Sequence, residues 1–273
     1  MKTIGLALGG GGARGLAHIP MLEVFDELGL RPHRMAGTSI GAVMGALYAA
    51  GMTGAQIRER VRGMVITRGD SFREALRKKE ALKSIRFFDV DLRHGGLFKG
   101  DRFIAFLYDA MRAATFEELA VPLRVVATDF YAAEQVVLDS GALLEAVKAS
   151  MGLPGVFTPV TRDGRVLIDG GCVNPLPYDL LDDCELVVAV DVMGELRQTG
   201  CRRPHPVRAV LSTFDIMQKS LIAEKRKRAP PDIYIRPALV DVDILEFYRA
   251  DEIYAQAEPA RRELREALER ALA

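Results

Sequence analysis

Apolar positions along the chain follow two periods, and segments of the two kinds alternate. Short, nearly continuous apolar runs such as residues 4–8 and 186–192 are typical of buried strands. Apolar residues at helical spacing occupy segments such as 15–28. The full prediction is strands at 4–8, 34–37, 123–128, 135–138, 165–168, 186–192 and 233–236, and helices at 15–28, 40–50, 143–150, 207–228 and 251–272. This alternation over the whole chain, 1–273, predicts a single α/β domain.

Residues 58–102 interrupt the alternation, because they are basic, helical in pattern and poor in strand signals. Between positions 58 and 86, ten Arg and Lys residues stand against four Asp and Glu residues, a local balance of +6. We expect an insertion or cap here. A basic, partly apolar surface of this kind is either a solvated helical face or a surface that adsorbs to anionic bilayers.

The composition makes some classes of function less probable than others. The chain of 273 residues has 37 Lys and Arg against 37 Asp and Glu, so a general binder of nucleic acid is not expected. Its three cysteines, Cys172, Cys184 and Cys201, lack zinc-site spacing and are interpreted as reduced thiols of a cytoplasmic protein. No secretory leader and no apolar run long enough to span a bilayer is visible.

A glycine-rich loop follows the first strand. Residues 9–15 read GGGGARG and contain a G-x-G-x-x-G match at Gly10, Gly12 and Gly15. Bare backbone N–H groups before a helix stabilise either a pyrophosphate or an oxyanion. A dinucleotide site needs an acidic residue at the end of the second strand, and that strand ends instead in Gly37-Thr38-Ser39.

A second glycine motif lies at the end of the second strand. Gly37-Thr38-Ser39-Ile40-Gly41 matches the G-x-S-x-G pattern of a nucleophile elbow, in which a sharp strand-to-helix turn exposes a serine hydroxyl. The alternative is a serine that only caps a helix packed through small residues.

A nucleophilic serine needs a base. Among the four histidines, only His94 and His205 follow Ser39, and neither stands at the end of a predicted strand. Asp169 does, directly before Gly170-Gly171, and sites in open α/β sheets form at that edge. A carboxylate is a weak base, so it needs apolar surroundings or a close hydroxyl to act here. The alternative is a plain Asp-Gly turn.

The three motifs, in this order, resemble the patatin-like phospholipase family. Residues 149–159 and 169–177 look like the family's segments around the aspartate, and residues 247–257 are similar to its bacterial, neuropathy-target-esterase-like branch. The resemblance implies a three-layer α/β/α sandwich with a mostly parallel central sheet. It also implies that Ser39 is the nucleophile and Asp169 its base, a dyad without histidine.

The same resemblance assigns the other site residues. It implies an oxyanion hole formed by Gly10, Gly11, Gly12, Ala13, Arg14 and Gly15, with turn glycines at Gly37, Gly41, Gly170 and Gly171. The implied reaction is cleavage of a fatty-acyl ester, a phospholipid or a lysophospholipid, through an acyl-enzyme. No cofactor and no metal is expected. The cysteines and the basic segment, rather than the resemblance, predict a location in the cytoplasm with peripheral contact to an anionic inner membrane face.

Two alternatives to hydrolysis stay open. An acyl transferase would use the same dyad, and a nucleotide-binding regulatory protein would use only the loop at 9–15. One departure from the family is Pro20, where many relatives carry glycine. Because proline fits poorly inside a helix, we expect the first helix to start later or to kink. His18 lacks an evident acidic partner and is interpreted as a packed helix residue.

Overall fold

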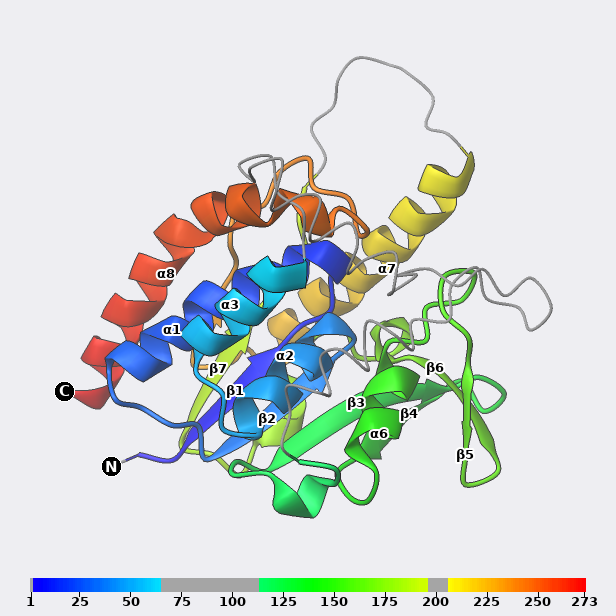
Figure 1. The fold of residues 1–273 in the computed structure, drawn as a ribbon, viewed down its shortest axis with the longest axis horizontal. Coiled ribbons are helices and arrows are strands. Elements are labelled where there is room, and N and C mark those ends of the chain that lie inside the picture. Colours follow the sequence, from blue (N-terminus) through cyan, green and yellow to red (C-terminus); the bar gives the residue numbers. More distant parts are fainter. Residues whose placement is uncertain (1, 65–112, 196–205) are drawn as a thin grey trace.

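The computed structural model describes residues 2–64, 113–195 and 206–273. These residues form an eight-stranded sheet between helical layers (Figure 1). Most of the predicted insertion at 58–102 lies outside the described residues, as do His94, Cys201 and His205. No helix of the described ranges is both long and apolar enough to cross a membrane.

The sheet has a parallel body and an antiparallel end. Its order is β5-β6-β3-β2-β1-β7-β8, and β4 pairs with β3. The pairs β3–β2, β2–β1, β1–β7 and β7–β8 are parallel, whereas β4, β5 and β6 pair antiparallel. The strands are β1 Ile4–Leu8, β2 Arg34–Thr38, β3 Leu123–Asp129, β4 Glu134–Leu138, β5 Val160–Arg162, β6 Arg165–Asp169, β7 Leu186–Val190 and β8 Ile233–Ile235.

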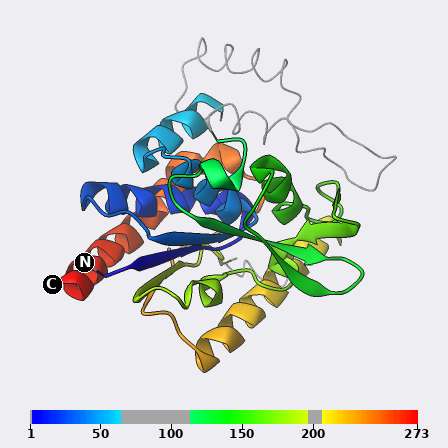
Figure 2. The ribbon, with the colours of Figure 1, turned by 90° about the horizontal axis from the view of Figure 1, so that it is seen from below.

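Helices cover both faces of this sheet. The α-helices are α1 His18–Glu27, α2 Ile40–Ala49, α3 Gly54–Met64, α6 Leu143–Ser150, α7 Pro206–Arg228 and α8 Ala250–Leu272. Short 3-10 helices are η1 Gly12–Ala17, η2 Phe116–Glu118, η3 Gly170–Cys172, η4 Tyr178–Leu181 and η5 Phe247–Arg249. Figure 2 shows α7 on the opposite side of the sheet from α1 and α2. The predicted three-layer α/β/α sandwich with a mostly parallel sheet is confirmed.

The side-chain alternation of β1 explains the two layers. Leu6 and Leu8 point into the large core that α1, α2, α3, α6 and α8 share, whereas Ala7 points into a smaller core with Leu181 of η4 and Ile222 of α7. All ten residues of α2 are buried, which accounts for the long apolar run that the sequence shows there.

The first helix starts later than the periodicity indicated, as Pro20 had led us to expect. The 3-10 helix η1 occupies Gly12–Ala17, and α1 begins at His18. Pro20 therefore lies in the first turn of α1, where a backbone N–H has no intrahelical acceptor to lose.

Strand β5 and the short 3-10 helices were not predicted, and α3 was predicted only in part, as the start of the helical segment 58–102. The strand β5 has three residues, too few for a visible alternation, and it joins β6 through Asp163 and Gly164, which both have positive φ. Helix α3 continues through residues 58–64 and buries Ile57 and Val61 in the large core. The start of the predicted insertion is thus part of a packed helix, and an insertion or cap stays a prediction for 65–102.

Candidate active site

Ser39 stands at a strained turn between β2 and α2. Its φ of 53° lies in the left-handed region, which residues other than glycine rarely adopt. The turn is tight because a Cβ atom on Gly41 would overlap the carbonyl oxygen of Leu8, and one on Gly37 would come within 2.7 Å of the backbone of Ala42. The two glycines of the motif thus allow α2 to start directly against the sheet.

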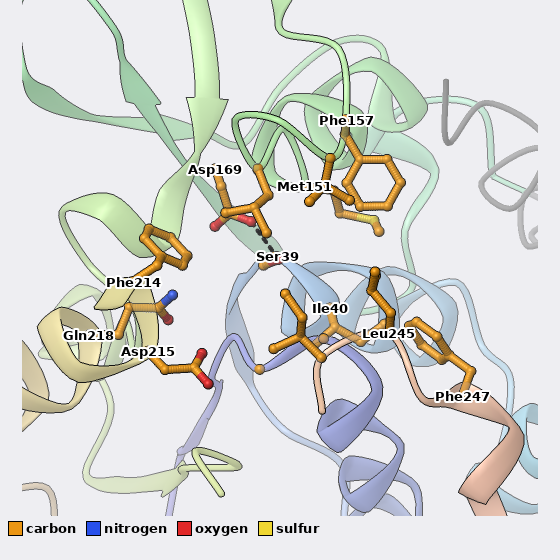
Figure 3. A pocket seen from close by; sticks show the side chains of 15 residues that line it. Ser39, Ile40, Met151, Phe157, Asp169, Phe214, Asp215, Gln218, Leu245 and Phe247 are labelled. Atoms are coloured by element: carbon orange, nitrogen blue, oxygen red, sulfur yellow. Dashed lines mark hydrogen bonds between the residues drawn. The ribbon is translucent and has the colours of Figure 1, made fainter. Parts of the chain in front are cut away.

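The register of β3 brings Asp169 to Ser39. Along one edge of β3, Val126 pairs with Thr38 of β2, and the next residue, Ala127, pairs with Asp169 of β6. Because β2 runs parallel to β3 and β6 runs antiparallel, their carboxyl ends meet. Ser39 Oγ donates a hydrogen bond of 2.8 Å to Asp169 Oδ2 (Figure 3).

The carboxylate of Asp169 is fixed from several sides. Its Oδ1 accepts a 2.7 Å hydrogen bond from Gly171 N–H, and its backbone carbonyl accepts one of 2.8 Å from the Thr128 hydroxyl. Gly170 has no room for a side chain, because a Cβ atom would overlap the carbonyl of Val126. Burial raises the pKa of Asp169 to about 6, against the lowering effect of the hydrogen bonds from Gly171 and Ser39.

Ser150 supports the elbow from α6. The backbone N–H of Ser39 donates to Ser150 Oγ at 2.8 Å, and the Ser150 hydroxyl donates to the carbonyl of Val126 at 2.6 Å. Ser150 is fully buried. We did not predict this role, because a serine at the end of an amphipathic helix has the same sequence pattern whether or not it contacts another turn.

The glycine loop offers two free N–H groups to the pocket. Gly11 and Gly12 line the pocket beside Ser39, and no acceptor within the described residues binds their N–H groups. The N–H of Gly10 is bonded to Pro175 O at 2.9 Å, and that of Ala13 to Ile244 O at 2.8 Å. Of the six predicted oxyanion residues, Gly10 and Ala13 therefore have their donors engaged elsewhere.

Arg14 and Gly15 turn away from the pocket. The Arg14 side chain is buried and donates a 2.5 Å hydrogen bond to Asp215 of α7. A Cβ atom on Gly15 would overlap the side chain of Ile40, so this glycine permits close contact between η1 and α2. Both residues hold the loop in place against neighbouring helices.

His18 is a buried structural residue. Its Nε2 lies 2.8 Å from the carbonyl oxygen of Gly9, and burial lowers its pKa to about 4, so the ring is neutral at pH 7. The interpretation of His18 as a packed helix residue is confirmed. Within residues 2–64, 113–195 and 206–273, no cluster of three or more His, Cys, Asp or Glu side chains suits a metal ion.

An open pocket of about 780 Å³, including the space that opens to solvent, adjoins Ser39 and Asp169. One wall comes from the segment between α6 and β6, with Met151, Leu153, Val156 and Phe157. The remaining lining includes residues from elements that the sequence analysis did not assign to the site. These residues are Phe214, Asp215 and Gln218 of α7 on one side, and Ile244, Leu245 and Phe247 between β8 and α8 (Figure 3).

The sequence of this chain matches a known protein family. The family model for patatin-like phospholipases matches residues 6–182, which is more than half of the chain and includes Ser39 and Asp169. The chain belongs to the patatin-like phospholipase family. The family match ends before α7, so it contains Ser39 and Asp169 and omits the pocket residues of α7 and of 244–247.

Family relatives include larger proteins. An uncharacterized NTE family protein of Mycobacterium tuberculosis is 33% identical over 193 residues, which are 70% of this chain and 49% of that protein. Patatin-like phospholipase domain-containing protein 6 of Homo sapiens is 33% identical over 197 residues, 70% of this chain and 13% of that protein. The chain thus spans about half the length of its mycobacterial relatives and a small part of the human one.

Two solved structures are also similar to the chain over most of its length. VipD from Legionella pneumophila has a TM-score of 0.47 at 16% identity, covering 96% of this chain and 67% of its own. ExoU from Pseudomonas aeruginosa, solved in complex with SpcU, has a TM-score of 0.45 at 14% identity, covering 99% of this chain and 52% of its own.

Proposed function

We propose that this member of the patatin-like phospholipase family is a serine acyl hydrolase with a Ser39–Asp169 dyad. Its substrates are fatty-acyl esters, phospholipids or lysophospholipids, and the reaction passes through an acyl-enzyme. The observation that carries the proposal is the 2.8 Å hydrogen bond from Ser39 Oγ to a buried Asp169 carboxylate at the edge of an apolar pocket. An activated hydroxyl beside a preformed apolar pocket suits attack on the carbonyl of a lipid ester.

Acylation begins with proton transfer. Because its pKa is raised to about 6, Asp169 is ionised at pH 7 and still basic enough to accept the Ser39 proton. Ser39 Oγ then attacks the ester carbonyl carbon, and the carbonyl oxygen becomes an oxyanion. The free N–H groups of Gly11 and Gly12 stabilise that charge. Collapse of the intermediate expels the alcohol or lysolipid, which takes the proton from Asp169.

Deacylation repeats the sequence with water. Asp169 takes a proton from a water molecule, and the resulting hydroxide attacks the acyl carbon. The bond from that carbon to Ser39 Oγ breaks, the free fatty acid leaves, and Ser39 recovers its proton from Asp169. An acyl transferase would run the same step with an acceptor alcohol in place of water.

The walls of the pocket favour an acyl chain. Aliphatic and aromatic side chains line both sides, and Asp215, the acidic residue of the α7 wall, is engaged by Arg14. This loop suits a nucleotide poorly, because the segment around Ile244 covers it. The carbonyl oxygen of Ile244 accepts a hydrogen bond from the Ala13 N–H, and it lies so close to Gly12 that a Cβ atom there would overlap it. The proposal includes a cytoplasmic location and contact between the basic segment 58–102 and an anionic membrane, which rest on the sequence.

Fluorophosphonate labelling and p-nitrophenyl ester turnover test the dyad directly. We expect a single covalent adduct on Ser39 and turnover of an acyl ester, both lost in Ser39→Ala. The matched control is Ser140→Ala on an exposed serine, which should retain both activities. Labelling and turnover that persist in Ser39→Ala would refute the proposal, and product formed only with an added alcohol would indicate the transferase.

A further inference from the structure

A buried glutamine of α7 lines the pocket beside the catalytic pair. Gln218 is 5% exposed, and its Oε1 is buried with no hydrogen-bond donor among the described residues. Burying a carbonyl oxygen without a donor costs free energy, so native structures rarely leave one unpaired. Figure 3 shows this side chain reaching from α7 towards the pocket. The unpaired oxygen therefore indicates a ligand that brings an O–H or N–H group.

The amide of Gln218 lies between the glycine loop and the Asp169 turn. Gln218 Cδ, Gln218 Nε2 and Asp169 Oδ1 each stand 3.0 Å from the point where a Cβ atom on Gly171 would be. On the other side, Gln218 Oε1 and Ser39 Cβ each stand 3.5 Å from the corresponding point on Gly10. The nitrogen of the amide thus lies on the side of Asp169, and its oxygen lies on the side of Ser39.

A single water molecule can donate hydrogen bonds of about 2.8 Å to two acceptors at once. A water molecule has two O–H groups, one for Asp169 and one for Gln218 Oε1. A water held by both groups would keep its lone pair for attack.

Two anchors keep Gln218 in place. One turn earlier on α7, Asp215 accepts the hydrogen bond of buried Arg14. Two turns later, Lys225 donates to Asn174 Oδ1 at 2.5 Å and to Leu176 O at 2.9 Å, in the segment that follows the Asp169 turn. The helix is therefore fixed to the glycine loop and to the aspartate segment on either side of Gln218.

We propose that Gln218 is a positioning residue that orients the water for deacylation. The inference rests on the proposed function, because it concerns the second half of that reaction. One water proton passes to Asp169 while the other stays hydrogen-bonded to Gln218 Oε1. The water oxygen bonds to the acyl carbon, the bond to Ser39 Oγ breaks, and the proton moves from Asp169 to Ser39. Acylation uses no water, so it does not need Gln218.

The test separates the two half-reactions in Gln218→Met, which keeps the length of the side chain and removes the amide. With enzyme in excess over p-nitrophenyl butyrate, release of p-nitrophenol reports acylation, and intact-mass spectrometry follows the decay of the acyl-enzyme. We expect acylation within about threefold of the wild type and deacylation slower by about 10- to 100-fold, the cost of misplacing a reacting group. Acyl-enzyme then accumulates in the variant.

Control variants distinguish a specific role of Gln218 from a general effect of the substitution on α7. Ser220→Met places the same side chain on the exposed face of the same helix and should change neither step. Gln218→Leu is the second variant if Gln218→Met fails to fold. Equal losses in both steps, or no loss in deacylation, would overturn the role of Gln218. A wild-type enzyme that forms no adduct on Ser39 would instead refute the proposed function itself.

Discussion

Replacing Asp169 with asparagine should make the protein more stable and far less active. The carboxylate is 3% exposed, and burial raises its pKa from 3.8 to about 6. Each pKa unit corresponds to about 1.4 kcal/mol, so the buried charge costs about 3 kcal/mol at neutral pH. Asparagine has the same shape and keeps an oxygen for the Gly171 N–H, without that charge.

The direction of the change in stability follows from the protonation of Asp169 in the folded and the unfolded chain. Below pH 3.8 the carboxyl is neutral in the folded and the unfolded chain, so the variant gains nothing there. As pH rises from 3.8 to about 6, the unfolded chain releases the proton while the folded chain retains it, and the wild type loses stability. Above about pH 6 the variant should keep a constant advantage of about 3 kcal/mol.

Urea unfolding of both proteins across pH 4 to 8 measures this difference. Asp139→Asn, on an exposed residue, controls for the chemical change itself. The kcat of Asp169→Asn should fall by about 10²- to 10⁴-fold, as expected for loss of a general base. A difference in stability that does not grow with pH, or a variant less stable at pH 8, would refute the assignment of a costly buried charge to Asp169.

Three further predictions concern Asp169 and the turn at Ser39. In wild-type enzyme, kcat should fall below pH about 6 as Asp169 gains its proton, visible in a pH–rate profile. Ser150→Ala leaves the Ser39 N–H without its acceptor, so the free energy of unfolding should drop by about 1–3 kcal/mol and acylation should slow. Gly41→Ala forces a Cβ into the β1 backbone and should lower the melting temperature, whereas Gly63→Ala in α3, with open space around its Cβ, should not.

The turns that carry Ser39 and Asp169 could be predicted because their constraints are local. The turn at Ser39 leaves no room for a side chain at positions 37 and 41, so Gly37 and Gly41 supply a recognisable sequence pattern. Asp169 could be placed at the right edge of the sheet because it directly follows an apolar strand and precedes two glycines. Their 2.8 Å contact could not be predicted, since it depends on the register of β3, which pairs with both strands.

The α7 wall could not be predicted, because its apolar pattern does not reveal a buried face. Val210, Ile216 and Met217 are 70%, 65% and 58% exposed, whereas the polar Gln218 is buried. A periodicity argument assigns apolar residues to the core and glutamine to solvent, which is the reverse of what packing against the Asp169 turn requires here. Residues 244–247 lack a regular pattern altogether.

The turns and the pocket lining are therefore subject to different constraints. Steric limits on the backbone allow few residue types at the turns of Ser39 and Asp169, whereas the pocket lining only has to be apolar and complementary in shape to an acyl chain. Family membership therefore says more about the type of reaction than about which acyl group is cleaved. A substitution in the pocket lining should change the selectivity for acyl chains and leave the reaction itself unchanged. Leu245 suits a test, because Figure 3 shows it in the pocket away from Asp169.

Leu245→Trp should shorten the acyl chain that the enzyme accepts. Each methylene displaced from an apolar wall costs about 0.8 kcal/mol, or about fourfold in kcat/KM. A p-nitrophenyl ester series from acetate to palmitate should show losses that grow with chain length, while the pH–rate profile stays in place. Leu221→Trp, the same substitution on α7 outside the residues that line the pocket, should leave the series unchanged. An equal loss for acetate and palmitate would mean that the acyl chain does not pass Leu245, and that the wall beyond the family match does not select the substrate.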